Sequence, residues 1–361
     1  MRAALVHNTG DETVEIVDDL ELAPLGPTDV CVEIKATGVC HSDLHAMRGD
    51  LPQGAPFVPG HEGAGVVIDI GEAVTQVAVG DHVVVCWSPP CGKCTHCIDL
   101  KSPHLCIMIQ FAVAAVPTFM RGDTQVFGFA GTGTWAERMI LPQEAAIKVD
   151  DDVPFEIASL IGCGVTTGVG AAINTAKVVP GSTCVVFGCG GVGISVIQGC
   201  RLAGAATIVA VDLNDDKLKT ALTFGATHSC KPDQLAGLKA ELTGGAMGFD
   251  YAFEAIGLPE TVRAAYDAAR RGGSAIVVGA GNMTKTVEFN MFELFFDEKT
   301  IKGSYYGSAD VRSDFNRFLR LWKAGKLDLE GMITNRIGIE DTNSAIDQMV
   351  KGEAVRTVIS L

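Results

Sequence analysis

The chain has 361 residues, of which 47% are hydrophobic and 20% are charged, and its formal net charge is -15. This length accommodates two domains with sizeable cores, and the composition is typical of a globular α/β protein. The acidic balance argues against a nucleic-acid partner or an anionic membrane surface, because both require basic patches.

The N-terminus and the hydropathy pattern predict a cytoplasmic protein. The first 17 residues lack the apolar core and the small-residue cleavage site of a secretory signal. No uninterrupted apolar stretch approaches the roughly 18 residues of a membrane span, because glycine and polar residues interrupt even the segment 178–196. In such a chain, twelve cysteines indicate metal binding or catalysis rather than a disulfide framework.

Short β-like runs dominate the first 90 residues. They lie at 3–7, 30–36, 65–70 and 82–87, and Gly, Pro and Asp separate them. We therefore expect a compact, mostly antiparallel β domain here rather than a βαβ array.

Within this region, Cys40 and His61 supply a thiolate and an imidazole, two ligand types that zinc favours. Glu62 follows the histidine directly, and a carboxylate there can orient the ligand and tune the metal. Two ligands do not make a catalytic zinc site, so a third has to come from elsewhere in the chain. A buried cysteine and a hydrogen-bonded core histidine explain this stretch equally well.

A segment that we call the cysteine lobe, residues 91–106, comes next. Its four cysteines, spaced C-x2-C-x2-C-x8-C, are Cys91, Cys94, Cys97 and Cys106. Four thiolates in one short segment can close a tetrahedral shell around zinc, so we expect a structural site. An iron–sulfur cluster is the alternative; we favour zinc because nothing else in the sequence indicates electron transfer.

Residues 107–140 form a glycine-rich connection that contains several aromatic residues. Loops of this length are uncommon inside a compact domain and often line a binding site. The residues themselves assign no chemistry to it.

From about residue 165 strands and helices alternate. Three glycines between a strand-like run and an apolar helical run match G-x-G-x-x-G, namely Gly188, Gly190 and Gly193. They allow a tight turn and close approach of a pyrophosphate to the helix N-terminus. Asp212, at the end of the next strand, is placed to accept hydrogen bonds from the adenosine ribose and to repel a 2′-phosphate, which favours NAD over NADP. An ordinary glycine-rich turn is the alternative.

The alternation continues through three more strand-like runs, at 250–254, 274–278 and 300–303. This pattern predicts a doubly wound parallel sheet. An amphipathic helix follows at 314–324, and we expect the last strand, at 357–361, to return to the first domain.

Taken in order, these motifs closely resemble those of the zinc-containing medium-chain alcohol dehydrogenases. The likeness includes Cys40, GHE at 60–62, the cysteine lobe, GCG at 162–164 and GCGGVG at 188–193. It implies an α/β fold that combines a Rossmann doubly wound parallel sheet with a mostly-β GroES-like catalytic domain. Residues 1–164 and 306–361 would form the catalytic zinc-binding domain, and 165–305 the NAD-binding domain.

The resemblance also implies the ligands of two zinc ions. Cys163 becomes the third ligand beside Cys40 and His61, which is the known two-cysteine, one-histidine pattern of alcohol dehydrogenases and keeps a position open for water or alkoxide. The four lobe cysteines would hold the structural zinc. The last lobe spacing is one residue longer than usual in the family, so Cys106 is the least secure ligand.

The implied catalytic residues surround the first zinc site. Ser42 stands where the family takes up the alcohol proton, and His45 would pass that proton to solvent through the nicotinamide ribose. Asp43 and Glu62 would be the carboxylates that orient the ligands.

Coenzyme contacts are implied at His41, Thr167, Gly188, Gly190, Gly191, Val192, Gly193, Asp212, Lys217, Val278 and Arg356. Asp212 and Lys217 would bind the adenosine ribose. Thr167 would lie behind the nicotinamide, and Arg356 near the pyrophosphate. His41 replaces the arginine of many relatives, from which we expect weaker phosphate contact and faster NADH release.

The substrate residues implied are Leu51 and Trp87. A tryptophan beside the zinc narrows the pocket and favours primary over bulky secondary alcohols, although Trp87 is also explained by core packing. Glutathione-dependent members carry an acidic residue and an arginine where this chain has Leu51 and Gln110, so we expect no glutathione-adduct reaction.

The resulting hypothesis is a zinc-dependent oxidoreductase that interconverts primary aliphatic or aromatic alcohols and aldehydes with NAD. A nicotinoprotein with tightly bound NAD(H), a dehydrogenase of sugar or secondary alcohols, and a non-enzymatic zinc-free relative are the alternatives. The expected partner is a small alcohol or aldehyde, without nucleic acid or membrane. The family implies a homodimer or homotetramer through strands near 287–305.

Overall fold

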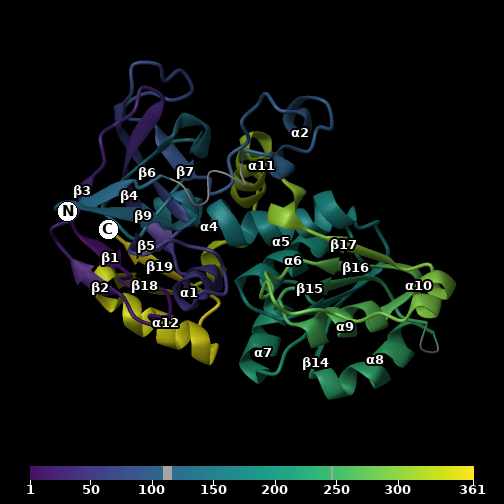
Figure 1. The fold of residues 1–361 in the computed structure, drawn as a ribbon. Coiled ribbons are helices and arrows are strands. Elements are labelled where there is room, and N and C mark those ends of the chain that lie inside the picture. The colour runs from purple at the N-terminus through teal and green to yellow at the C-terminus, as the bar shows by residue number, and fades with distance from the viewer. Residues whose placement is uncertain (109–115, 245–246) are drawn as a thin grey trace. The chain divides into compact units, whose positions relative to one another are not determined.

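The computed structural model describes residues 1–108, 116–244 and 247–361 (Figure 1). The chain divides into two compact units. Unit 1 comprises Met1–Cys163 and Asp310–Leu361, and unit 2 comprises Gly164–Ala309. Gln110, one of the two positions that argue against a glutathione substrate, lies outside the described residues.

Unit 1 is built on a sheet of seven strands among its described residues, in the order β11-β7-β6-β4-β19-β18, with β10 paired to β4. Their bounds are β4 Asp29–Gly38, β6 Gly63–Ile70, β7 His82–Val85, β10 Arg138–Pro142, β11 Ala146–Lys148, β18 Ile333–Gly338 and β19 Arg356–Ser360. Each pairing in this sheet is antiparallel except that of β18 with β19. The mostly antiparallel β domain expected from the sequence is therefore present.

Further strands and helices complete unit 1. Its other strands are β1 Ala3–Leu5, β2 Glu15–Val17, β3 Glu21–Leu22, β5 Phe57–Val58, β8 Phe119–Arg121 and β9 Thr124–Gly128. Its α-helices are α1 His41–Arg48, α2 Thr95–Ile98, α4 Phe155–Leu160, α11 Val311–Lys323 and α12 Thr342–Lys351. The C-terminal strand β19 pairs with β4, Val358 opposite Gly38, so the chain end returns to the sheet that its first residues build.

The segment 107–140 is not one long connection, and this expectation was wrong for its second half. β8 and β9 form an antiparallel hairpin there, and β10 begins at Arg138. The hairpin forms because Gly122 turns the chain at a φ of 57° and because Phe119 and Val126 are fully buried on one face. Glycines in this stretch mark a tight turn rather than an open loop.

Unit 2 contains a parallel sheet of six strands in its described part, ordered β14-β13-β12-β15-β16-β17. The strands are β12 Thr183–Phe187, β13 Thr207–Val211, β14 His228–Cys230, β15 Phe249–Glu254, β16 Ala269–Val277 and β17 Thr300–Gly303. The helices are α5 Thr166–Gly170, α6 Gly191–Leu202, α7 Asp215–Thr223, α8 Leu235–Leu242, α9 Pro259–Ala268 and α10 Met291–Asp297.

Helices flank this parallel sheet on both sides, with α6 on one side and α8 and α9 on the other (Figure 1). The central strands are covered on both faces and accordingly read as continuous apolar runs such as CVVF in β12. The predicted doubly wound sheet is confirmed, and with it the α/β fold class.

One helical stretch, Phe155–Ala176, is long and apolar enough to cross a membrane by length and composition. The sequence expectation concerned uninterrupted apolar stretches, and Glu156 and Asn174 are among the polar residues that interrupt this one. Of its most apolar window, 83% is buried inside the protein. A helix buried to this extent is a core helix, and its apolar character serves packing.

Candidate active site

Four potential ligand atoms converge in unit 1. They belong to Cys40, His61, Glu62 and Cys163, are all buried, and lie within 4.8 Å of one another. Cys40 precedes α1, His61 follows β5, and Cys163 lies in a single π-helical turn, Ile161–Val165, just after α4. Such turns occur frequently at functional sites. The structure thus brings together the two ligands named from local sequence and the third implied by resemblance.

Asp43 holds the histidine in place. Its Oδ1 accepts hydrogen bonds from His61 Nδ1 and from the N–H of Gly60, each at 2.9 Å, and its Oδ2 accepts one from the N–H of Cys40 at 3.1 Å. Gly60 itself has a φ of 94°, and a Cβ there would lie 2.4 Å from Trp135, so only glycine fits. The carboxylate therefore fixes the imidazole tautomer and direction, as expected for a metal ligand.

The opposite ring nitrogen, Nε2 of His61, is buried and makes no hydrogen bond among the described residues. A buried polar atom without a partner is costly unless something binds it. Two sulfurs and one imidazole nitrogen around it form the soft and borderline donor set that zinc prefers. The residues fit a zinc ion.

Electrostatic coupling within the cluster also favours a cation. The Cys163 thiol donates toward Cys40 and, despite burial, the pKa of Cys40 lies well below its ordinary value, while that of Cys163 is raised well above it. Burial is the largest single effect and acts to lower the pKa of His61, but the Asp43 carboxylate and the Cys40 thiol together raise that pKa well above the usual range. A proton therefore competes with a metal for this site.

Glu62 and Arg356 form a buried ion pair, with Arg356 Nη2 3.2 Å from Glu62 Oε1. Burial raises the pKa of Glu62 to about 7, against the opposing effect of Arg356. Gly38 makes room for the pair, since a Cβ there would lie 2.1 Å from Glu62 Oε2. The resemblance implied that Arg356 lies near the pyrophosphate; in unit 1 its guanidinium lies beside this carboxylate and interacts with the thiols of Cys40 and Cys163.

The residues implied in proton transfer lie on α1. The Cys40 sulfur is 3.8 Å from the Ser42 hydroxyl oxygen, so this hydroxyl is directly beside the ligand cluster. His45 Nδ1 is 2.9 Å from Asp50 Oδ2, and both side chains are about one-third exposed. His41 begins α1 and is exposed.

Two aromatic rings pack edge-on against the His61 ring. The ring centroid of Trp87 is 6.3 Å away and that of Phe129 is 5.3 Å away. Leu51 and Trp87 are both partly buried against the apolar core of unit 1. Phe129 was missed from the sequence, because the one signal was its place in a glycine-rich aromatic stretch and nothing local connects it to His61.

The cysteine lobe forms a second cluster in unit 1. The sulfurs of Cys91, Cys94, Cys97 and Cys106 lie within 4.8 Å of one another, and Cys106 is only 2% exposed. Desolvation acts to raise the pKa of Cys94, but the N–H groups of Cys97 and Ile107 lower it to about 6. The extra residue in the last spacing does not keep Cys106 away from the other three. Four sulfurs with no other ligand fit a structural zinc ion.

The glycine turn of unit 2 has the geometry of a phosphate site. Gly188 has a φ of 92°, and a Cβ on Gly193 would lie 1.8 Å from the Gly188 carbonyl oxygen, so both require glycine. A Cβ on Gly190 would meet no protein atom within 4 Å, which leaves open space in front of the N-terminus of α6. The cradle fits a dinucleotide pyrophosphate.

Other implied coenzyme residues also lie in unit 2. Asp212 follows β13 and accepts a hydrogen bond from the N–H of Cys189 at 2.8 Å, so it is tied to the glycine turn. Lys217 is in the first turn of α7, and Val278 follows β16. Thr167 lies in α5 and is 9% exposed, and the neighbouring Gly168 packs against α6. Gly191 and Val192 begin α6.

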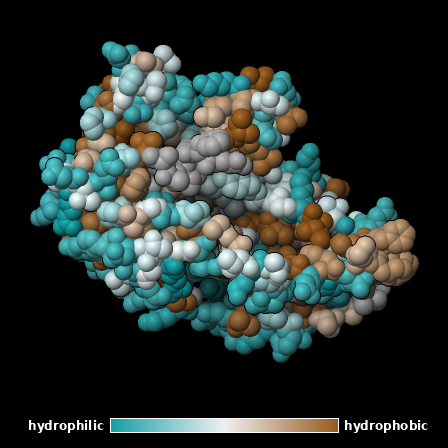
Figure 2. Space-filling model, viewed as in Figure 1, coloured by the Kyte–Doolittle hydropathy of each residue, from teal (hydrophilic) through white to brown (hydrophobic). Residues whose placement is uncertain are grey.

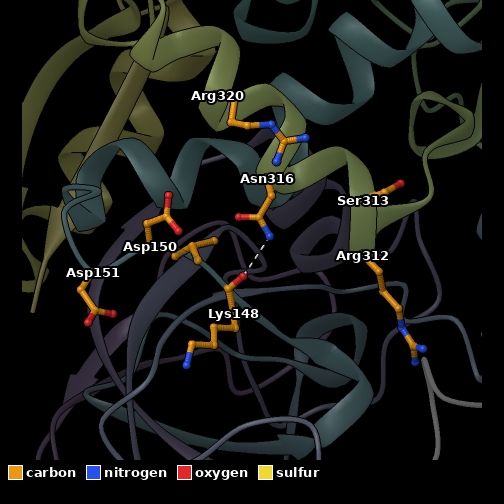
Figure 3. A pocket seen from close by; sticks show the side chains of 8 residues that line it. Lys148, Asp150, Asp151, Arg312, Ser313, Asn316 and Arg320 are labelled. Atoms are coloured by element: carbon orange, nitrogen blue, oxygen red, sulfur yellow. Dashed lines mark hydrogen bonds between the residues drawn. The ribbon is translucent and has the colours of Figure 1, made fainter.

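A surface pocket of about 870 Å³ lies elsewhere in unit 1, between α11 and the segment after β11 (Figure 3). Asn316 donates to the carbonyl oxygen of Lys148 across it at 3.1 Å, and Arg312, Arg320 and Asp150 line it. None of the site residues implied by the sequence lines this pocket. We assign no part of the chemistry to it.

Two family models match the chain. Residues 26–151 match the alcohol dehydrogenase GroES-like domain, and residues 191–324 match the zinc-binding dehydrogenase family. The first match covers the region of Cys40, His61 and the cysteine lobe, and the second begins within the glycine turn.

Individual proteins match nearly the whole chain. The NDMA-dependent alcohol dehydrogenase of Amycolatopsis methanolica is 39% identical, with 99% of this chain and 98% of that protein aligned. The S-(hydroxymethyl)glutathione dehydrogenase of Paracoccus denitrificans is 37% identical, with 99% of each covered. Among solved structures, benzyl alcohol dehydrogenase from Acinetobacter calcoaceticus superposes with a TM-score of 0.91 at 32% identity, covering 100% of this chain and 99% of the other.

Proposed function

Because the chain belongs to the zinc-containing medium-chain alcohol dehydrogenase family, we propose that it interconverts primary alcohols and aldehydes with NAD. The observation that carries the proposal is the buried cluster of Cys40, His61 and Cys163, whose histidine presents an unpartnered Nε2 to two thiols. Unit 1 is then the catalytic domain and unit 2 the coenzyme domain. This cluster argues against a zinc-free, non-enzymatic relative.

Zinc bound there would supply Lewis-acid stabilisation of an alkoxide, and NAD bound in unit 2 would accept the hydride. The protein groups divide the remaining tasks. Asp43 orients His61. The Glu62–Arg356 ion pair lies beside the thiols, and in it the positive guanidinium balances the negative carboxylate. The Ser42 hydroxyl, next to the Cys40 sulfur, accepts the alcohol proton as it releases its own proton into the relay. His45, oriented by Asp50, then passes the proton to solvent.

The preferred coenzyme follows from Asp212, whose carboxylate ends β13 and is held at the glycine turn. A negative charge at this place accepts hydrogen bonds from ribose hydroxyls and repels a 2′-phosphate. We therefore propose NAD rather than NADP, with Lys217 and Thr167 as further contacts and with Arg356 near the pyrophosphate in addition to its ion pair with Glu62.

Aromatic and aliphatic primary alcohols are the proposed substrates, because Trp87 and Phe129 pack on His61 and leave an apolar surrounding. Leu51 lacks the charge that a glutathione adduct would need, so we do not extend the activity named for the Paracoccus denitrificans relative to this chain. Sugar alcohols, which need polar partners, are disfavoured for the same reason.

A second candidate is a nicotinoprotein that keeps NAD(H) bound between turnovers. One observation favours it: the 39%-identical relative is named for its dependence on NDMA. Denaturing the purified protein and assaying the supernatant for nucleotide separates the two. One NAD(H) per chain supports the nicotinoprotein, and an empty preparation supports exchangeable NAD.

We further propose a cytoplasmic homodimer or homotetramer that uses the edge of the unit 2 sheet. β17 is an edge strand, and helix α10 beside it exposes large apolar side chains, gathered in Figure 2 over this end of the molecule. Met291 is 86% exposed and Phe295 is 80% exposed. Such a patch is unusual on a monomer. Sedimentation of wild type and Phe295→Glu tests this interface; a monomeric wild type would refute it.

The activity is tested by initial-rate NAD reduction with alcohols from ethanol to octanol and with benzyl and cinnamyl alcohols. We expect activity with NAD, at least about tenfold less with NADP, and none after Cys40→Ser. Preference for sorbitol or 2-propanol would contradict the substrate class. No activity with free NAD, together with activity when an electron acceptor is added, would support the nicotinoprotein hypothesis.

A further inference from the structure

Glu254, the last residue of β15, is fully buried in unit 2. Its Oε1 accepts three hydrogen bonds: from the N–H of Ile256 at 2.8 Å, from the N–H of Gly257 at 2.7 Å and from the Thr261 hydroxyl at 2.7 Å. No salt bridge within the described residues involves Glu254, and its Oε2 is buried without a hydrogen bond. Burying a carboxylate costs free energy. The burial of Glu254 therefore indicates a role beyond its place at the end of a strand.

The hydrogen bonds of Glu254 fix a turn, residues 255–257, that rests on the glycine turn. A Cβ on Gly188 would lie 2.6 Å from Ile256 Cγ1 and 3.3 Å from the Ala255 carbonyl oxygen. The N–H of Ala255 donates to the carbonyl oxygen of Phe187 at 2.9 Å. The turn held by Glu254 is thus in van der Waals contact with the first glycine of the proposed phosphate cradle.

The backbone of Glu254 also holds the segment that follows β16, which begins at Val278. Its carbonyl oxygen accepts from the N–H groups of Val278 and Gly279 at 2.8 and 3.0 Å. A Cβ on Gly279 would lie 2.3 Å from the nitrogen of Gly257, so the two segments touch. One residue therefore ties together three chain segments at the carboxyl edge of a parallel sheet, where ligands of such sheets bind.

We propose that Glu254 is a positioning residue for coenzyme binding: its carboxylate locks the 255–257 turn against Gly188 and so holds the glycine turn in its binding shape. This rests on the proposed function, which places NAD at that turn. Loosening the turn costs ordering free energy when NAD binds, so it weakens affinity without removing a contact to the coenzyme. The zinc cluster of unit 1 shares no residue with it.

The cleanest test removes one donor and leaves the carboxylate in place. Thr261→Val keeps the shape of the side chain but deletes the hydroxyl, which is also 2.9 Å from the Leu258 carbonyl oxygen. We expect the Kd for NADH, from a fluorescence titration, to rise about threefold to tenfold, with zinc content unchanged. Thr223→Val is the matched control, since that hydroxyl donates to the carbonyl oxygen of Thr220 at the end of α7; its Kd should stay at the wild-type value.

Substitution of Glu254 itself gives the second test. Glu254→Gln retains an acceptor oxygen and should bind NADH within about twofold of wild type, whereas Glu254→Ala should bind at least about tenfold more weakly. In steady state the KM for NAD should rise in Glu254→Ala, with no fall in kcat at saturating NAD. If coenzyme co-purifies, the dissociation rate of NADH is compared instead of the Kd.

A purely structural role would lower the unfolding temperature and leave the Kd of the folded protein unchanged, and that result overturns the proposal. If Glu254→Ala does not fold, Thr261→Val decides alone: an unchanged Kd refutes the positioning role. A wild-type protein that binds no NAD(H) refutes the proposed function instead, so the two failures are distinguishable.

Discussion

Two clusters of metal-binding side chains lie in the same unit but are assembled in opposite ways. The cysteine lobe takes four sulfurs from one segment of 16 residues, and three of its cysteines are partly exposed. The Cys40–His61–Cys163 cluster takes its atoms from three separate segments, the last of them more than 100 residues beyond the other two, and each residue is buried. The lobe has four thiols, enough to complete a tetrahedral zinc shell, whereas the buried cluster has two thiols, one imidazole and a nearby carboxylate.

This difference indicates that one cluster has a structural role and the other a catalytic role. A locally assembled, all-sulfur shell stabilises the loop that carries it and has no position for a reactant. A shell built from distant segments is held rigid by the core around it, as Asp43 and the Glu62–Arg356 pair show. Rigid placement of that kind suits chemistry.

The largest effect that separates the clusters is expected from Cys163→Ser. Activity should fall at least about a thousandfold, because the stabilisation of the alkoxide is worth several kcal/mol. Metal analysis should show loss of one zinc of the two per chain. The matched control is Cys97→Ser in the lobe, which should also lose one zinc but keep the activity of its folded fraction. Equal activity loss in both variants would contradict the division of roles.

The lobe should determine stability. We expect Cys106→Ser to lower the unfolding temperature by roughly 5–10 °C, because the extended loop loses its cross-link, while kcat with benzyl alcohol stays close to wild type. Differential scanning fluorimetry with and without a chelator measures this. No change in unfolding temperature would mean that Cys106 is not a ligand.

The hydrogen bond from His61 to Asp43 should contribute to zinc affinity even when His61 itself is unchanged. Asp43→Asn leaves the histidine but weakens the bond to Nδ1, and we expect zinc affinity at the buried cluster to fall about tenfold to a hundredfold. Competition with a chromophoric chelator measures it at each site. Asp99→Asn, inside the lobe but not among its four cysteines, is the control and should change neither affinity.

The smallest predicted effect concerns thiol ionisation in the metal-free lobe. The pKa of Cys94 is lowered to about 6 by the N–H groups of Cys97 and Ile107, although desolvation opposes them, whereas burial raises the pKa of Cys97 to about 12. Alkylation of Cys94 by iodoacetamide should therefore rise with pH through about 6 and level off by neutral pH. Cys97 should react slowly throughout. Mass spectrometry of peptides after brief exposure would show whether this order is reversed.

The sequence predicted the arrangement of residues well where these residues lie close together along the chain. The lobe spacing, the glycine turn with Asp212 and the apolar strand runs each place their functional atoms within a few residues or one βαβ unit. It failed where glycine marks a turn in a hairpin, as at Gly122. The helical stretch Phe155–Ala176 reaches the length of a membrane span although Glu156, Asn174 and threonines interrupt its apolar residues, because most of it is buried in the core.

The residues alone predicted the parallel sheet, the β-rich domain, the dinucleotide turn and Cys40 and His61 as two candidate zinc ligands. Folding supplied the partners that no spacing reveals: the Phe129 ring on His61, the pairing of Glu62 with Arg356 in the room left by Gly38, and the three donors gathered on Glu254. The physical reason is the separation along the chain between the residues that interact. Turns and closely spaced ligands are specified by neighbours along the chain, whereas a buried charge finds its partner only after distant strands and helices have packed around it.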